Sequence, residues 1–116
     1  MKYDLEERAG KFGENTILFV KGVKKDDINW SIIIQLVRSS TSIGANYMEA
    51  NAASSKKDFR NKISICRKEA NESKHWLRMI AKTNPEHDNT CRKMWKESHE
   101  LTLIFSKIFK NSQVKN

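Results

Sequence analysis

The sequence predicts an all-α protein: one domain of 116 residues folded as an antiparallel up-down-up-down four-helix bundle. One Pro and four Gly leave few helix breakers. Apolar residues recur at steps of three and four in four separate runs. The links between the runs are only a few residues long, which favours antiparallel neighbours. We therefore expect helices over residues 4–22, 28–52, 56–82 and 85–111.

Side chains that can cap a helix mark the predicted starts. The expected N-caps are Asp4, Asp26 or Asp27, Ser55 and Asn84. Asp58 lies three residues after Ser55, as the acidic residue of a capping box does. Pro85 follows Asn84 and suits the first helical position, so this pair predicts the start of the last helix.

The apolar rows predict which faces form the core. The third helix has the most regular row, consisting of Phe59, Ile63, Cys66, Ala70, Ser73, Leu77 and Ile80. Two adjacent rows on the second helix predict a wide buried face, and the small residues Ser40, Gly44 and Ala45 predict that another helix crosses close to it. Two cysteines without metal-type spacing are expected to be reduced core thiols.

The net charge of +8 is concentrated in one helix. Residues 56–82 carry nine basic and three acidic side chains, so this segment supplies +6 of the total. Such a field attracts polyanions: nucleic acid first, then an acidic protein or anionic lipid. A surface that merely keeps the protein soluble is the alternative.

Five cations of this helix fall on one side of it at about 100° per residue. They form the basic stripe: Lys56, Arg60, Arg67, Lys74 and Arg78. The stripe runs roughly 33 Å, long enough for several consecutive phosphates. No exposed aromatic row interleaves with it to stack bases, which predicts salt-sensitive, sequence-tolerant binding. A solvated helix face is the alternative.

A polar row lies beside the apolar face of the second helix. Its members are Arg38, Ser39, Ser42, Asn46 and Glu49. Arg38 and Glu49 are about 16 Å apart along one helix and cannot pair with each other. We expect a hydrogen-bonded seam with another helix or subunit, with Glu69 and Lys62 as candidate partners, and plain surface as the alternative.

We expect no enzymatic activity, no metal and no cofactor. Glu72 and His75 match one Glu-x-x-His element of a di-iron site, but the sequence holds no second copy. His87 and Cys91 have the spacing to share a metal but lack a completing pair. The sequence contains no phosphate-binding loop, dinucleotide-binding motif or nucleophile elbow.

The second and third helices resemble a known family. Residues 35–50, with the pattern RSxxSIxAN over residues 38–46, then residues 55–59, Lys68-Glu69 and Trp76-Leu77, are similar to the bacterial proteins encoded within intervening sequences of 23S rRNA genes. The opening residues 4–8 also fit. The resemblance implies a four-helix bundle that assembles into a ring, typically a homopentamer. It also implies that the polar row is part of the family signature.

These observations predict a non-enzymatic, homo-oligomeric protein that binds nucleic acid, RNA in the first instance, through the basic stripe. The alternatives are a scaffold that docks an acidic protein, which the resemblance suggests is a reverse transcriptase, or a passenger of the intervening sequence without activity. No apolar run approaches the roughly 20 residues that span a bilayer, and the N-terminus lacks a signal-peptide core. We expect a cytoplasmic protein that does not bind membranes.

Overall fold

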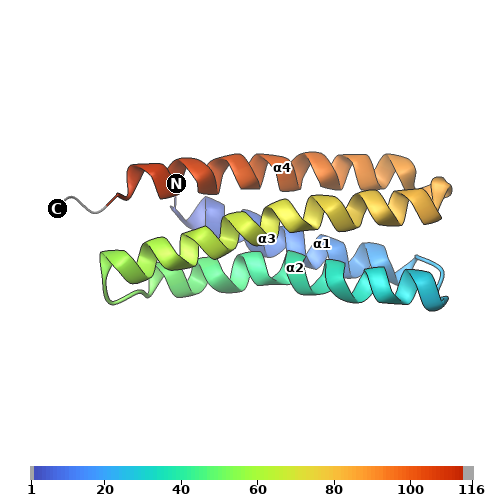
Figure 1. Ribbon diagram of the computed structural model, residues 1–116, viewed down its shortest axis with the longest axis horizontal. Coiled ribbons are helices and arrows are strands. Elements are labelled where there is room, and N and C mark those ends of the chain that lie inside the picture. Colours follow the sequence, from blue (N-terminus) through green and yellow to red (C-terminus); the bar gives the residue numbers. More distant parts are fainter. Residues whose placement is uncertain (1, 114–116) are drawn as a thin grey trace.

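The computed structural model describes residues 2–113, and in it four helices run alternately up and down one long axis (Figure 1). They are α1 (Lys2–Lys21), α2 (Asp27–Asn51), α3 (Lys56–Thr83) and α4 (Asp88–Asn111), with a short 3-10 turn, η1 (Pro85–His87), before α4. This arrangement confirms the predicted all-α four-helix bundle.

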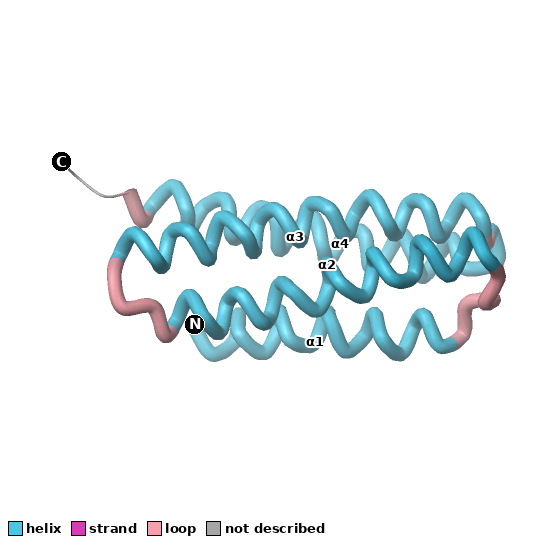
Figure 2. The backbone as a smooth tube through the Cα atoms, turned by 60° about the horizontal axis from the view of Figure 1, so that its bottom comes forward, coloured by secondary structure: helices cyan, strands magenta, loops and turns pink. Residues whose placement is uncertain are grey.

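Consecutive helices pack side by side, joined by loops at the two ends of the bundle (Figure 2). The first and last helices contact each other much less than the consecutive pairs do. Arg8 of α1 bridges this seam, because its guanidinium donates to Glu97 at 2.7 Å and to Glu100 at 2.9 Å. These ion pairs thus join α1 to α4, two helices that contact each other little.

The core comes from the rows that the sequence predicts. Ile63, Leu77 and Ile80 of α3 are completely buried, as are Leu36 and Ile43 of α2. Phe105 of α4 is also completely buried and meets the Tyr47 ring edge-on, with centroids 5.5 Å apart. The apolar periodicity therefore identified the buried faces.

Two predicted caps are present and two are wrong. Asp26 accepts a hydrogen bond from the Asn29 backbone N–H at 2.8 Å, and Ser55 accepts one from Asp58 at 3.0 Å. These bonds satisfy backbone donors that the first helical turn leaves free. Asp4 is not an N-cap, because α1 already begins at Lys2.

The predicted cap at Asn84 is also wrong. Its side chain makes no cap bond and is buried, where it forms a reciprocal amide pair with Asn29 at 2.9 and 3.0 Å. The same amide donates to the Ile80 carbonyl at the end of α3. Pro85 begins η1, and α4 starts three residues later, at Asp88. A contact from another helix has taken the side chain that would otherwise cap α4.

The close crossing expected at Gly44 is present between α1 and α2. A Cβ on Gly44 would lie 3.3 Å from the Gly10 Cα, and one on Gly13 would lie 3.3 Å from the Thr41 Cα. Ser40 is buried, but Ala45 is exposed, so its assignment to the crossing was wrong. Glycine permits the backbones of α1 and α2 to touch here.

Replacing Gly10 and Gly44 separately with alanine tests this crossing. Gly10→Ala should raise the free energy of unfolding by about 0.5–1 kcal/mol, because alanine favours helix and its Cβ meets nothing within 4 Å. Gly44→Ala should lower it by about 1 kcal/mol, because its Cβ presses on the α1 backbone. Urea unfolding followed by circular dichroism measures both, and equal gains would contradict the crossing.

Both cysteines are buried and unpaired with each other, as expected. Burial raises the pKa of Cys66 to about 12 and that of Cys91 to about 11, from an ordinary value of 9.0. Because the folded state favours the neutral thiols, their contribution to stability is complete below pH 9.0 and is lost as the pH rises toward those values.

Iodoacetamide labelling tests the state of these thiols. Neither cysteine should react in the native protein at neutral pH, and both should react in urea, because the thiolate is the nucleophile and both side chains are enclosed. Labelling of native Cys66 at the unfolded rate would contradict this burial.

Several large apolar side chains remain exposed on α1 and α2. They are Ile17, Leu18, Ile28, Trp30, Ile34 and Met48. Trp30, Ile34 and Met48 are separated by whole helical turns and share one face of α2. Within residues 2–113 no helix combines the length and apolarity that a bilayer span requires.

Candidate nucleic-acid interface

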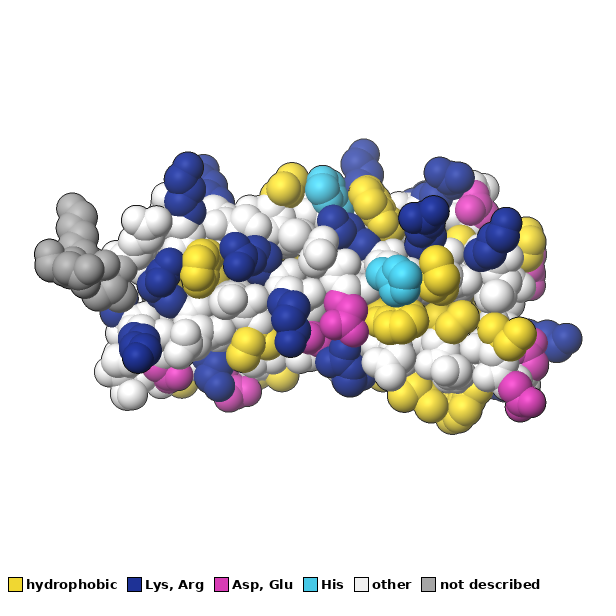
Figure 3. Space-filling model, in the orientation of Figure 1, with side chains coloured by type: hydrophobic (Ala, Val, Ile, Leu, Met, Phe, Trp, Pro, Cys, Tyr) yellow, Lys and Arg dark blue, Asp and Glu magenta, His cyan; other side chains and the backbone are white. Residues whose placement is uncertain are grey.

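The basic stripe lies along the side of α3 that borders α4. Arg60, Arg67 and Lys74 are half-buried against α4, whereas Lys56 and Arg78 near the ends of α3 are exposed. Figure 3 shows Lys and Arg side chains distributed along the length of this face. The stripe is therefore the edge of a surface shared by two helices.

Two stripe arginines lie on one aromatic ring of α4. The Arg60 guanidinium carbon is 4.0 Å from the Phe109 ring centroid, and that of Arg67 is 4.7 Å from it. Arg60 also donates to the Phe109 carbonyl at 3.4 Å, while its buried Nε has no hydrogen-bond partner among the described residues. The ring attracts the cations through its electron-rich face and holds their stems in place without neutralising them.

Lys74 contacts a second aromatic group of α4. Its ammonium lies 5.2 Å from the Trp95 ring centroid and 3.0 Å from His99 Nδ1. An ammonium only donates hydrogen bonds, so Nδ1 is the acceptor. The Trp95 and His99 rings stack, with centroids 5.1 Å apart and planes 16° apart. Trp95 is 40% exposed.

The stripe cations have no carboxylate partners among the described residues. Elsewhere in residues 2–113, by contrast, carboxylates pair with Arg8, Arg38, Lys62 and Arg92. A row of five cations without counter-charges among residues 2–113 produces a concentrated positive potential.

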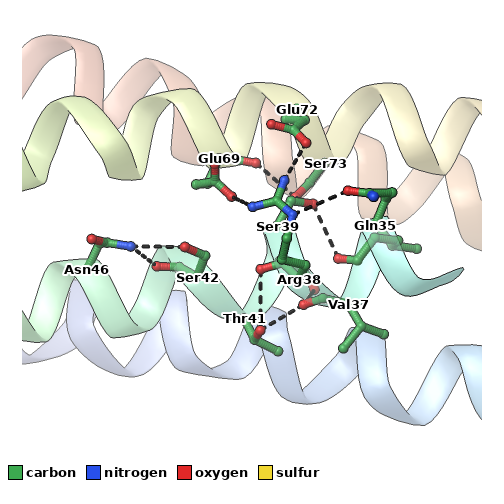
Figure 4. A network of polar contacts seen from close by, with 12 residues as sticks. Gln35, Val37, Arg38, Ser39, Thr41, Ser42, Asn46, Glu69, Glu72 and Ser73 are labelled. Carbon is green, nitrogen blue, oxygen red and sulfur yellow. Dashed lines mark hydrogen bonds and ion pairs between the residues drawn. The ribbon is translucent and has the colours of Figure 1, made fainter. Parts of the chain in front are cut away.

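The polar row connects α2 to α3 (Figure 4). Arg38 donates to Glu69 at 2.8 Å and also contacts Glu72. Glu69 is a buried carboxylate, with a side chain only 4% exposed. Ser39 and Ser73 share a buried hydrogen bond of 2.8 Å. These contacts form a polar seam inside one chain.

The remaining members of the row behave differently. Asn46 donates to the Ser42 carbonyl and hydroxyl within α2, at 2.8 and 2.9 Å. Glu49 pairs with Lys62 across the α2–α3 interface at 3.2 Å. Glu69 and Lys62 are thus the partners of Arg38 and Glu49 within the chain. A role for the row between subunits stays a prediction.

Glu72 has a perturbed pKa for a visible reason. Burial by itself would raise the pKa of its carboxyl group. Hydrogen bonds from the Trp76 indole and the Arg38 guanidinium favour the charged form, however, and the net effect lowers the pKa. Glu72 therefore remains ionised beside Arg38 at neutral pH.

A family model described as 23S rRNA-intervening sequence protein matches residues 1–107. The chain belongs to this family. It is also similar to a solved structure, a protein with unknown function from the S23 ribosomal protein family of Bacteroides thetaiotaomicron, with 31% identity and a TM-score of 0.83. The match covers 95% of this chain and 99% of that one. No curated protein matches.

This member of the intervening-sequence family carries aromatic groups beside the stripe that were not predicted from the sequence. Trp95, His99 and Phe109 of α4 lie beside the cations, and of these three rings only Trp95 is exposed. A signal was available: Trp95 and Phe109 are two heptads apart on α4, as Arg60 and Lys74 are on α3. Only the register between the helices shows that these pairs face each other.

The metal motifs considered from the sequence do not assemble into a cluster. His75 is exposed on α3 and stacks edge-on with Trp76, and His87 contacts Phe19 in the same manner. Within residues 2–113 no group of three or more His, Cys, Asp and Glu side chains is placed to hold a metal ion.

Proposed function

We propose that this protein binds nucleic acid, RNA in the first instance, through the basic stripe, and that it acts by binding without a chemical step. The observation that carries this proposal is the uncompensated charge of Lys56, Arg60, Arg67, Lys74 and Arg78 on one face. In contrast, Arg8 and Arg38 are committed to carboxylates. Cations without carboxylate partners can replace the counterions of a phosphate backbone.

Aromatic support strengthens the proposal. Phe109 fixes the stems of Arg60 and Arg67, so less side-chain entropy is lost when a phosphate binds. Arginine presents a forked set of donors that suits phosphate oxygens. The binding is expected to depend on salt and to tolerate different sequences.

Reversing the charge of Lys56 and Arg78 tests the proposal without disturbing packing, because both are exposed. The double variant Lys56→Glu plus Arg78→Glu should bind RNA at least about tenfold more weakly at about 150 mM salt. The slope of log affinity against log salt should fall by about 2, because two phosphate contacts are lost. Fluorescence anisotropy with labelled RNA measures both quantities.

The matched control is Lys11→Glu plus Lys24→Glu, which makes the same change in net charge at exposed sites on α1 and on the loop that follows it. It should lower affinity much less. Equal losses in the two double variants would show that only net charge matters, and would refute a defined binding face. Failure of the wild-type protein to bind RNA would favour a scaffold for an acidic protein.

We also propose a homo-oligomer, a pentamer as the family resemblance implies. The exposed apolar face of α2 at Trp30, Ile34 and Met48 supports self-association, since apolar side chains gathered on one face favour burial. A ring would multiply weak contacts to one polyanion. Light scattering after size-exclusion chromatography tests this, and a monomeric mass would refute it.

A further inference from the structure

We propose that Trp95 and His99 form a stacking platform for an unpaired base, so that the nucleic acid bound at the basic stripe is single-stranded where it crosses α4. This inference rests on the proposed function and specifies its substrate class. It comes from the placement of a stacked ring pair, with Trp95 exposed and His99 half-buried, directly beside a stripe cation.

Trp95 presents aromatic surface to solvent. Trp95 is 40% exposed although its indole is one of the largest apolar side chains. Its ring lies within cation–π distance of the stripe cation Lys74. A base stacked on this indole would remove apolar surface from water and extend the Trp95–His99 stack by one layer.

Neighbouring side chains hold both rings of the platform in place. The Trp95 ring is held by His99 at 5.1 Å, and Lys74 ties both rings to α3 through its contacts with the indole and with Nδ1. The platform is therefore built by two helices and is in place before a ligand arrives. Such preorganisation limits the entropy lost on binding.

Basic side chains of α3 lie on both sides of the platform. Arg78 lies one helical turn beyond Lys74 on α3, and Arg67 lies two turns before it. Cations thus flank the platform on both sides, as a strand needs if its backbone runs along the stripe while one base turns onto Trp95. Bases in a duplex are already stacked on each other, so only an unpaired segment can use such a surface.

The test compares Trp95→Ala, Trp95→Phe and Leu103→Ala with the wild-type protein. Leu103 is the matched control, because it is an exposed apolar residue of the same helix without an aromatic ring that could stack on a base. Affinities are measured for a single-stranded oligo(U) RNA of about 12 nucleotides and for an RNA duplex of similar length, at about 150 mM salt. Circular dichroism verifies that each variant is folded.

We expect Trp95→Ala to weaken single-strand binding by about tenfold and duplex binding by less than about twofold. Trp95→Phe should retain most of the affinity, because phenylalanine also stacks, and Leu103→Ala should match the wild type. If Trp95→Ala fails to fold, His99→Ala should show the same selective loss at a smaller magnitude.

The outcomes separate this inference from the proposed function. If Trp95→Ala weakens both ligands equally, or neither, the platform is refuted, while the proposed function stands provided that Lys56→Glu plus Arg78→Glu weakens binding. If the wild-type protein binds neither ligand, both proposals are refuted.

Discussion

Truncating Phe105 to alanine is expected to lower the free energy of unfolding by about 3–5 kcal/mol. Phe105 is completely buried in the core and packs edge-on against Tyr47. Removing its ring loses the transfer energy of the buried surface and leaves a cavity that rigid helices fill only in part. Guanidinium unfolding at a fixed protein concentration measures the loss, because the stability of the proposed homo-oligomer would depend on concentration.

Leu103→Ala is the control for this prediction. Leu103 lies two residues earlier on α4 but is 56% exposed, so its truncation should change the unfolding free energy by less than about 0.5 kcal/mol. A Phe105→Ala loss below about 1 kcal/mol would mean that α4 is not packed as described.

Replacing Arg38 with alanine is expected to lower the free energy of unfolding by about 2–3 kcal/mol, because it leaves the buried Glu69 carboxylate without its cation. This value lies below that of a fully buried pair, since the Arg38 side chain is 48% exposed. Glu72→Ala should cost less than about 1 kcal/mol, because Arg38 then keeps Glu69 as its partner. Urea unfolding followed by circular dichroism measures each value.

The double variant Arg38→Ala plus Glu69→Gln distinguishes a lost charge from lost packing. A neutral amide at position 69 needs no cation, so we expect it to recover at least about 1 kcal/mol of the loss. If the double variant is less stable than Arg38→Ala alone, an unpaired charge is not the cause.

The sequence determined the four helices of this protein, and the reason is local. Apolar residues at steps of three and four place one side of each helix in the core whatever the neighbours are. The caps at Asp26 and Ser55 also depend only on the residue three positions later. Basic residues at turn spacing likewise fix the stripe as a row on α3.

Contacts between helices decided what the sequence could not. Asn84 is of a residue type that commonly caps helices, but its side-chain amide pairs instead with Asn29, which is distant in sequence. The seam at Arg38 required Glu69 to lie opposite it on α3, which the sequence offered only as a candidate.

The candidate site shows the same division. The cations could be found from the sequence of α3 alone, whereas the aromatic rings that contact them belong to α4. Only the antiparallel register brings Phe109 to Arg60 and Trp95 to Lys74. The sequence thus determined which cations form the stripe, and the tertiary structure determined which aromatic rings contact them. Facing residues on two helices are related by packing and not by spacing along the chain.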